Sequence, residues 1–227
     1  VFIIKFICTM KNSVFTTTVV VLCIVFTLFS CGSSDDGPSK PSRLLFINGL
    51  LDGKLSTILV EDSVLVALTA GFGGVTQYVE INSGNQNFKV RDNLTNTVVV
   101  NSNFNIGSAK NYSLMAIGTT ASPELIIHED DLSVADTTKG YIRLINLSSN
   151  SNPMTMSISS GADLATGVNY KSVSLFASLT PAKHDITIKS GATVVSSISN
   201  LNILPNKKYS ILITGLVNQT PKASYNI

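Results

Sequence analysis

The sequence has no tryptophan, and its 227 residues include only two histidines and three cysteines. Charged residues are scarce too: 13% are Asp, Glu, Lys or Arg, about half the usual fraction for a soluble domain. A formal net charge of +2 argues against a nucleic-acid-binding surface, which needs many clustered cations. Three cysteines are too few for a dense disulfide scaffold. The hydrophobic content of 44% is enough to build a core, which excludes a disordered chain.

The first thirty residues differ from the rest of the chain. Val14–Phe29 is an apolar run without a charge, which follows Met10 and Lys11 and ends before a cluster of small residues. A basic residue, a short apolar stretch and then small residues are typical of a secretory signal peptide. The run has 16 residues, whereas a membrane-spanning helix prefers about 20. We therefore predict that residues 1–30 are a signal peptide whose true start is Met10.

The junction after the apolar run has a more specific pattern. Leu28-Phe29-Ser30-Cys31 resembles the lipobox of bacterial lipoproteins, which has a small residue before the modified cysteine. The Cys31 thiol would form a thioether with diacylglycerol, and the amine freed by cleavage would be acylated. Two or three acyl chains anchor a protein firmly, whereas one chain binds only marginally. We predict lipidation at Cys31, which makes a membrane the first partner; an uncleaved signal anchor with an incidental cysteine is the alternative.

The segment after the cysteine indicates where the protein is held. Residues 32–42 read GSSDDGPSKPS, a composition that cannot bury a core, so we predict a lipidated flexible tether at 31–42. Gly32 is not the Asp that retains lipoproteins in the inner membrane of enteric bacteria, so we expect the outer membrane of a Gram-negative bacterium. Asp35-Asp36 resembles an acidic signal for export to the cell surface, although an ordinary solvated spacer explains it equally well.

From Arg43 onward, short runs of apolar and polar residues are separated by Gly, Asn, Ser and Pro. Val75–Ile81 and Phe88–Val90 alternate as half-buried strands do. Tyr112–Ile117 is more continuously apolar, which is expected of a strand buried on both faces. No segment after the signal has a sustained helical period with caps. The spacing of these runs predicts an all-β sandwich or barrel.

The second half of the chain repeats the first. Phe104–Gly118 aligns with Leu201–Gly215 at an offset of 97, and six of the fifteen residue pairs are identical. Upstream, Phe46–Asn48 aligns with Leu144–Asn146 at an offset of 98. We assign this one-residue slip to a single deletion in a loop.

The repeat defines the domain organisation. We predict two tandem immunoglobulin-like or transthyretin-like β-sandwich domains, at residues 43–136 and 139–227. Each has about 90 residues, which is small but within the range that folds alone. The acidic and polar segment His128–Gly140 is interpreted as the linker that joins them.

The order of motifs also makes a family resemblance recognisable. An opening strand at Phe46–Asn48 is followed by the block GFGGVTQY at Gly71–Tyr78, by FKVR at Phe88–Arg91, and by YSLMAIG at Tyr112–Gly118. From residue 43 to the last residue, the chain resembles the "domain of unknown function 4397" family, in which lipoproteins with tandem β-sandwich domains are common.

That resemblance implies a fold and no activity, because its motifs are strand and turn features. Many members open with a V-R-x-x-H-x-x-P pattern, and this chain has only Arg143 in place there, with no histidine after it in either half. The family contributes no catalytic residues to carry over.

Residues able to support catalysis are few. After the signal, Cys31 is the only cysteine and its sulfur would carry lipid, so no thiol nucleophile or cysteine-based zinc site remains. The histidines are His128, in the predicted linker, and His184, beside Asp185 at a strand end, and no G-x-S-x-G motif accompanies them. We predict no catalytic residue and no cofactor. A hydrolase is a third class of function, which no visible set of residues supports.

Two further motifs invite a ligand interpretation. The contiguous acidic cluster at His128–Asp131 could offer oxygens to calcium, but it lacks the spaced carboxylates and the turning glycine of a calcium loop, which favours a solvated linker. Gly71–Gly74 lacks the GK[ST] ending and the following helix of a phosphate loop, which favours a turn or bulge between strands. We predict no metal site.

Aromatic residues complete the search for a binding surface. Tyr112 and Tyr209 occupy equivalent positions in strands that look buried, which favours core or corner packing over sugar stacking. Tyr170 is the one candidate for an exposed aromatic side chain.

The sequence thus predicts a lipid-anchored envelope protein: a non-catalytic module that binds a glycan or protein partner at the outer membrane or cell surface, with no nucleic-acid partner. The alternative is a subunit or anchor of a surface assembly or adhesin, whose strand edges pair with partners.

Overall fold

The computed structural model describes residues 40–159 and 161–219, and the backbone of 224–226. The predicted signal peptide, Cys31 and most of the tether lie outside these residues. Residues 39–227 form one compact unit. Within the described residues, no helix is long and apolar enough to cross a membrane. Every described element is a strand, so the predicted all-β fold is confirmed.

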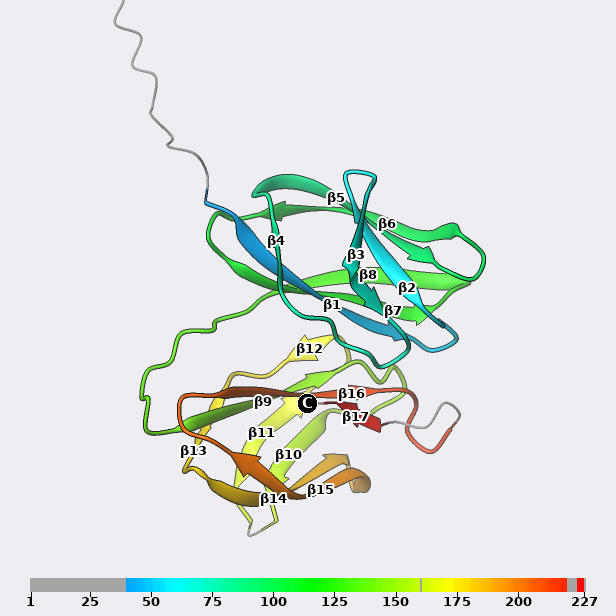
Figure 1. Cartoon of the computed structure of the whole chain (residues 1–227). Helices are drawn as coiled ribbons and strands as arrows, with labels where there is room; N and C mark the ends of the chain where they lie inside the picture. Colours follow the sequence, from blue (N-terminus) through cyan, green and yellow to red (C-terminus); the bar gives the residue numbers. More distant parts are fainter. Residues whose placement is uncertain (1–39, 160, 220–223, 227) are drawn as a thin grey trace, which may run out of the picture. The chain divides into compact units, whose positions relative to one another are not determined.

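The first half of the unit has two four-stranded sheets (Figure 1). Sheet A has the order β4-β1-β7-β8, in which β1 and β7 run parallel, and sheet B has the order β3-β2-β5-β6. Together they form what we call the first sandwich. The strand bounds are β1 (Ser42–Leu50), β2 (Ser56–Val60), β3 (Ser63–Ala70), β4 (Val79–Ile81), β5 (Gly84–Asp92), β6 (Thr97–Ile106), β7 (Asn111–Thr119) and β8 (Ser122–Glu129).

The second half has two corresponding sheets. Sheet C has the order β12-β9-β16-β17, with β13 also paired to β9, and sheet D has the order β11-β10-β14-β15; together they form the second sandwich. The parallel pair is β9 and β16. The strand bounds are β9 (Gly140–Asn146), β10 (Met154–Ile158), β11 (Asp163–Val168), β12 (Ser172–Val173), β13 (Ala177–Leu179), β14 (Ala182–Ser190), β15 (Thr193–Ile203), β16 (Lys208–Thr214) and β17 (Ser224–Asn226).

Each sandwich encloses its own core. In the first, Phe46 of β1 and Phe88 of β5 are fully buried, as are residues of the other long strands. In the second, Leu144 of β9 and Ile186 of β14 hold the corresponding places. Inward positions alternate along β5 and β14, which explains the alternating pattern visible in the sequence.

Most strands recur at the offsets found in the sequence. The change from an offset of 98 to one of 97, however, has a different origin from the one predicted. The β5–β6 turn has four residues and the β14–β15 turn has two. Strand β15 then has one extra residue near Asn200, because its pairing with β14 shifts there by one residue. The φ angle of Asn200 is +55°. The predicted single deletion in a loop is therefore wrong. A two-residue shorter turn and a one-residue β-bulge combine to give the slip.

The segment Val75–Ile81 was expected to be one strand, and it is interrupted. Val75 makes an isolated bridge to Ile47, and β4 covers only its last three residues. Between them, Thr76 Oγ1 accepts the hydrogen bond from the Phe46 backbone N–H at 2.9 Å. A side-chain oxygen thus replaces a backbone carbonyl as the acceptor, which interrupts the ladder of backbone hydrogen bonds to β1. Ser174 Oγ does the same for Leu144 in the second sandwich.

Both predicted corner tyrosines are confirmed. Tyr112 Oη accepts a hydrogen bond from the Gly107 N–H at 3.0 Å, and Tyr209 Oη accepts one from the Leu204 N–H at 3.1 Å. In each case the phenol fastens the turn five residues upstream, as a tyrosine corner does in β-sandwiches. Tyr112 is buried and Tyr209 is half-buried.

Removal of these hydroxyl groups should destabilise the two sandwiches unequally. We expect Tyr112→Phe to lower the free energy of unfolding by about 1–3 kcal/mol, because it leaves a backbone N–H unpaired beside a buried ring. Tyr209→Phe should cost less, since water reaches that site more easily. Urea unfolding of both variants measures this difference, and equal losses would contradict the role assigned to burial.

Candidate functional site

The central strands of sheets A and C are buried on both faces. Along β7, the six residues from Tyr112 to Ile117 are all buried, as the continuous apolar run predicted. One set of their side chains faces the core of the first sandwich. The other set belongs to a separate apolar cluster that also contains residues of β9 and β16; its buried members are Ile47, Met115, Ile117, Ile145, Leu147 and Leu212. This cluster, which we call the junction, joins the two sandwiches.

The junction uses equivalent positions from both halves. Ile47 corresponds to Ile145, and Met115 corresponds to Leu212, by the offsets of the repeat. It therefore resembles a two-fold interface in which one patch meets itself. The equivalence fails for Leu147, which aligns with Gly49, and for Ile117, which aligns with Thr214. It also fails where Arg143 stands at the position of Leu45. A small cavity of about 90 Å³ lies beside this point.

Arg143 is balanced by a buried carboxylate. Its Nη2 lies 2.7 Å from Oδ1 of Asp130, and the exposed fractions of the two side chains are 4% and 0%. The other carboxylate oxygen, Oδ2, accepts hydrogen bonds from the hydroxyls of Ser113 at 2.6 Å and Tyr78 at 2.7 Å. Arg143 Nε donates to Ser210 Oγ at 2.8 Å. A buried ion pair needs such additional hydrogen bonds to offset its desolvation.

Aromatic rings and the pKa of Tyr78 reinforce this arrangement. The guanidinium carbon of Arg143 lies 4.8 Å from the centre of the Phe176 ring, and Lys208 Nζ lies 4.2 Å from the same centre. Burial, followed by the Asp130 charge, raises the pKa of Tyr78, which keeps its hydroxyl a donor. Burial also lowers the pKa of Lys208, although Lys208 still donates to the Asp131 carbonyl at 2.5 Å.

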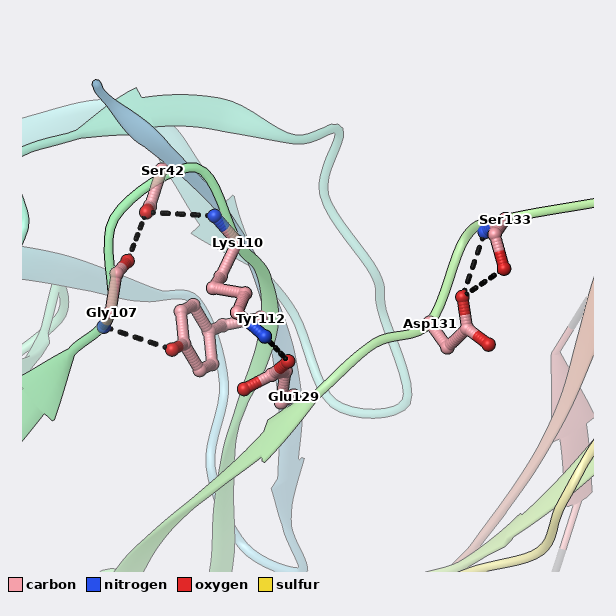
Figure 2. A network of polar contacts seen from close by, with 7 residues as sticks. All are labelled: Ser42, Gly107, Lys110, Tyr112, Glu129, Asp131 and Ser133. Carbon is pink, nitrogen blue, oxygen red and sulfur yellow. Dashed lines mark hydrogen bonds and ion pairs between the residues drawn. The ribbon is translucent and has the colours of Figure 1, made fainter.

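A groove of about 520 Å³ opens next to the ion pair. Figure 2 shows two polar contacts of residues that line it, between Lys110 and Glu129 and between Asp131 and Ser133. Lys110 Nζ contacts Glu129 Oε1 at 2.5 Å along the wall of the groove, and both side chains are half-exposed. Asp131 Oδ1 accepts hydrogen bonds from the Ser133 N–H and hydroxyl. Arg43 and Asn111 complete the polar lining. The groove thus presents cations, carboxylates, an amide and a hydroxyl to solvent.

The acidic segment differs from its expected form. Strand β8 extends to Glu129, so His128 lies in a strand and the connection begins at Asp130. The interpretation of this segment as a solvated linker is wrong for Asp130, which is buried in the ion pair. The three carboxylates point to different partners. Among the described residues, no group of three or more His, Cys, Asp and Glu side chains is placed to hold a metal ion.

The fold brings Ser113, His128 and Asp130 together, which the sequence did not suggest. Ser113 and His128 are directly opposite each other on β7 and β8. In a catalytic triad the histidine would lie between the other two. Here the Ser113 hydroxyl donates straight to Asp130, and Ser113 is 1% exposed. Burial lowers the pKa of His128 and favours its neutral form. The arrangement is that of a buried polar network.

The remaining sequence candidates have structural places. Gly71–Gly74 forms the predicted turn, in which Gly73 has φ +70° and donates to the Asn48 carbonyl at 2.7 Å. Tyr170 was expected to be exposed, but it is half-buried against the junction, because the turn that carries it packs there. His184 lies near the start of β14, with Nε2 2.8 Å from the Thr180 carbonyl oxygen. Cys31 lies outside the described residues.

Comparison with known sequences identifies one family. Residues 42–157 match the family described as "Domain of unknown function (DUF4397)". The match covers the first sandwich and continues through β9 and most of β10. No curated protein matches the chain significantly.

Several solved structures are similar at low identity. A family 26 carbohydrate-binding module from Eubacterium rectale in complex with maltoheptaose is 10% identical, with 81% of this chain and 96% of that one covered and a TM-score of 0.28. A candidate cell adhesion protein from Bacteroides fragilis is 11% identical, with coverages of 78% and 86% and a TM-score of 0.22. A candidate adhesin from Bacteroides ovatus is 10% identical, with coverages of 86% and 95% and a TM-score of 0.23. TM-scores this low carry no argument about function.

The ion pair can be tested by a double-mutant cycle. Arg143→Leu, which installs the residue found at the equivalent position 45, should lower the free energy of unfolding by about 3–5 kcal/mol, because the Asp130 charge stays buried without its partner. Adding Asp130→Asn should recover most of that loss, since a neutral amide can still accept from Tyr78 and Ser113. Additive losses measured by urea unfolding would contradict a direct pair.

Proposed function

Because the chain belongs to the DUF4397 family, whose description assigns no activity, we propose a function from the sites of the chain itself. We propose that it is a non-catalytic binding module of the cell envelope, held by lipid on Cys31 in the outer membrane of a Gram-negative bacterium. The observation that carries the proposal is Leu28-Phe29-Ser30-Cys31, followed by a tether and then a compact β unit. The signal peptide at 1–30 and the tether at 31–42 are parts of the same proposal.

The two sandwiches are proposed to be tandem copies of one immunoglobulin-like or transthyretin-like domain. Most of the corresponding strands begin at offsets of 96 to 98, which supports this proposal, and so do the matching tyrosine corners. The family match supports it for the first copy and reaches only β10 of the second. A shared origin would also explain why equivalent positions meet at the junction.

The partner is proposed to be a glycan or protein that is rich in polar groups. The groove beside the junction supports this, because its Lys110, Glu129, Asn111 and Ser133 side chains can match hydroxyl, amide and charged groups. The groove also includes Arg43, the second residue of β1, which lies next to the end of the tether in the sequence. Buried side chains such as Ser113 and Asp130 serve packing in this proposal and not chemistry.

The anchor is tested by changing its cysteine. Cys31→Ser should abolish incorporation of radiolabelled fatty acid and move the protein from the outer-membrane fraction to the soluble periplasmic fraction, because no thioether can form. Ser33→Cys in the Cys31→Ser background provides the control, since a thiol away from the lipobox should not restore labelling. Persistent labelling of the Cys31→Ser chain would contradict the proposed anchor.

The groove is tested with a glycan array probed with the protein from Gly32 onward. Lys110→Ala should reduce binding to any glycan that the unmodified protein retains, by about ten-fold if one charge-assisted hydrogen bond is lost. Lys54→Ala, an exposed lysine that does not line the groove, is the matched control. Equal binding by both variants would exclude the groove as the glycan site. Retention of no glycan at all would favour a protein partner.

A further inference from the structure

One of the two outer strands of sheet B, β6, has few of the features that normally protect a sheet edge. Strand β6 (Thr97–Ile106) ends the order β3-β2-β5-β6, so no described strand pairs with its outer side (Figure 1). Its ten residues, TVVVNSNFNI, include no charge, proline or glycine. Proteins usually block a long edge with charged residues, proline or a bulge, because free N–H and C=O groups can pair with another chain.

Strand β6 has one register shift, at Val99, and its pairing with β5 is regular beyond that residue. Val100–Ile106 pairs with Gly84–Val90 residue by residue, without a register shift. The corresponding edge in the second sandwich is β15, and it is interrupted at Asn200 by the inserted residue. A β-bulge of this kind bends and twists an edge away from pairing. The bulge that creates the sequence slip therefore disrupts β15 in a stretch whose equivalent in β6 is regular.

We propose that the β6 edge pairs antiparallel with β6 of a second copy of this chain, so that two B sheets join into one eight-stranded sheet. Self-pairing brings identical side chains close together, and an uncharged strand is the kind that can do this without repulsion. Strand β8 contacts β6 within the sandwich, and its carboxylates are already neutralised: Glu124 contacts Lys171, and Glu129 contacts Lys110.

The side-chain pattern fixes the register of this pair. Residues 101, 103 and 105 are exposed asparagines, whereas Val100, Ser102 and Phe104 are partly buried. From Val100 to Phe104, a two-fold axis at Ser102 keeps exposed residues opposite exposed ones. It places Asn101 opposite Asn103 of the second copy and Val100 opposite its Phe104. The Val–Phe contacts would then extend the two cores, to which both residues already belong in part.

The asparagines are prepared for such a contact. Asn87 Nδ2 donates to the Oδ1 atoms of Asn101 and Asn103, each at 2.6 Å. Both acceptor oxygens are thus oriented toward β5. The amide N–H groups of Asn101 and Asn103 can donate to the asparagines of the second copy. An asparagine ladder across the axis would add side-chain hydrogen bonds to those of the backbone.

The predicted dimer is a weak one. A single edge contact buries less than the standard interface of about 1,600 Å², so we expect an affinity in the micromolar range. Confinement to a membrane would raise the effective concentration of the chains. The pairing itself does not depend on the anchor, so it can be measured without lipid.

Sedimentation equilibrium of the protein from Gly32 onward tests the proposal. This form keeps the whole compact unit and every described core residue. The unmodified protein should show a monomer–dimer equilibrium, and Asn103→Lys should weaken it at least ten-fold, because it places a charge on the paired edge. Ser197→Lys, an exposed position on β15, is the matched control and should leave the dimer unchanged. A monomer at millimolar concentration, or a dimer insensitive to Asn103→Lys, would overturn the proposal.

Disulfide cross-linking tests the register. The protein from Gly32 onward has no native cysteine. Ser102→Cys should give a covalent dimer on oxidation, because directly opposite residues lie within the Cα separation that a disulfide spans. Asn105→Cys would face Val99 of the second copy and should stay uncross-linked. A reversed result would place the two-fold axis elsewhere and overturn the register.

Discussion

A sheet that is apolar on both faces must be covered on both faces, and sheets A and C meet that constraint by covering each other. Their parallel central strands carry one set of side chains into each sandwich core and another set into the junction. Neither sandwich could expose that second set without presenting a large apolar patch to water. The two-sandwich unit follows from this requirement.

A buried ion pair lies beside the junction, at a place where an apolar contact would have been sufficient. Apolar burial has no preferred direction, so an interface between equivalent patches could slide or rotate at little cost. Asp130 and Arg143 have defined partners on β7, β9 and β16, and any displacement would leave a buried charge unpaired. We infer that the pair fixes the alignment of the sandwiches, while the apolar cluster supplies most of the stabilisation. The ion pair also fixes the position of the groove, because Asp130 is one of the residues that line it.

The sequence predicted the features that depend on local pattern. Alternation identified β5, and continuous apolarity identified β7 as a strand buried on both faces. The repeated tyrosines identified the corners. Asp130 was missed because its environment comes from residues such as Tyr78, 52 positions away, while its own neighbours are acidic and typical of a solvated linker. The sequence also could not show how the offset changes from 98 to 97. An alignment records only the net change in length, which here combines a turn shorter by two residues and a bulge of one residue. The lipid anchor and the tandem domain assignment stay predictions.

The difference between the two outer edges has a consequence for assembly. If β6 and β15 were both open, each chain would have two pairing edges, and successive chains could join without limit into a filament. If β6 pairs and β15 does not, β6 can pair only with β6 of another chain, which closes this assembly at two chains. In this proposal, the bulge at Asn200 has a role that its local geometry does not reveal: it keeps β15 of the second sandwich from pairing with another chain. A repeat that duplicates a sandwich also duplicates its edges, and the inserted residue in β15 makes the two equivalent edges differ, so that both need not pair in the same way.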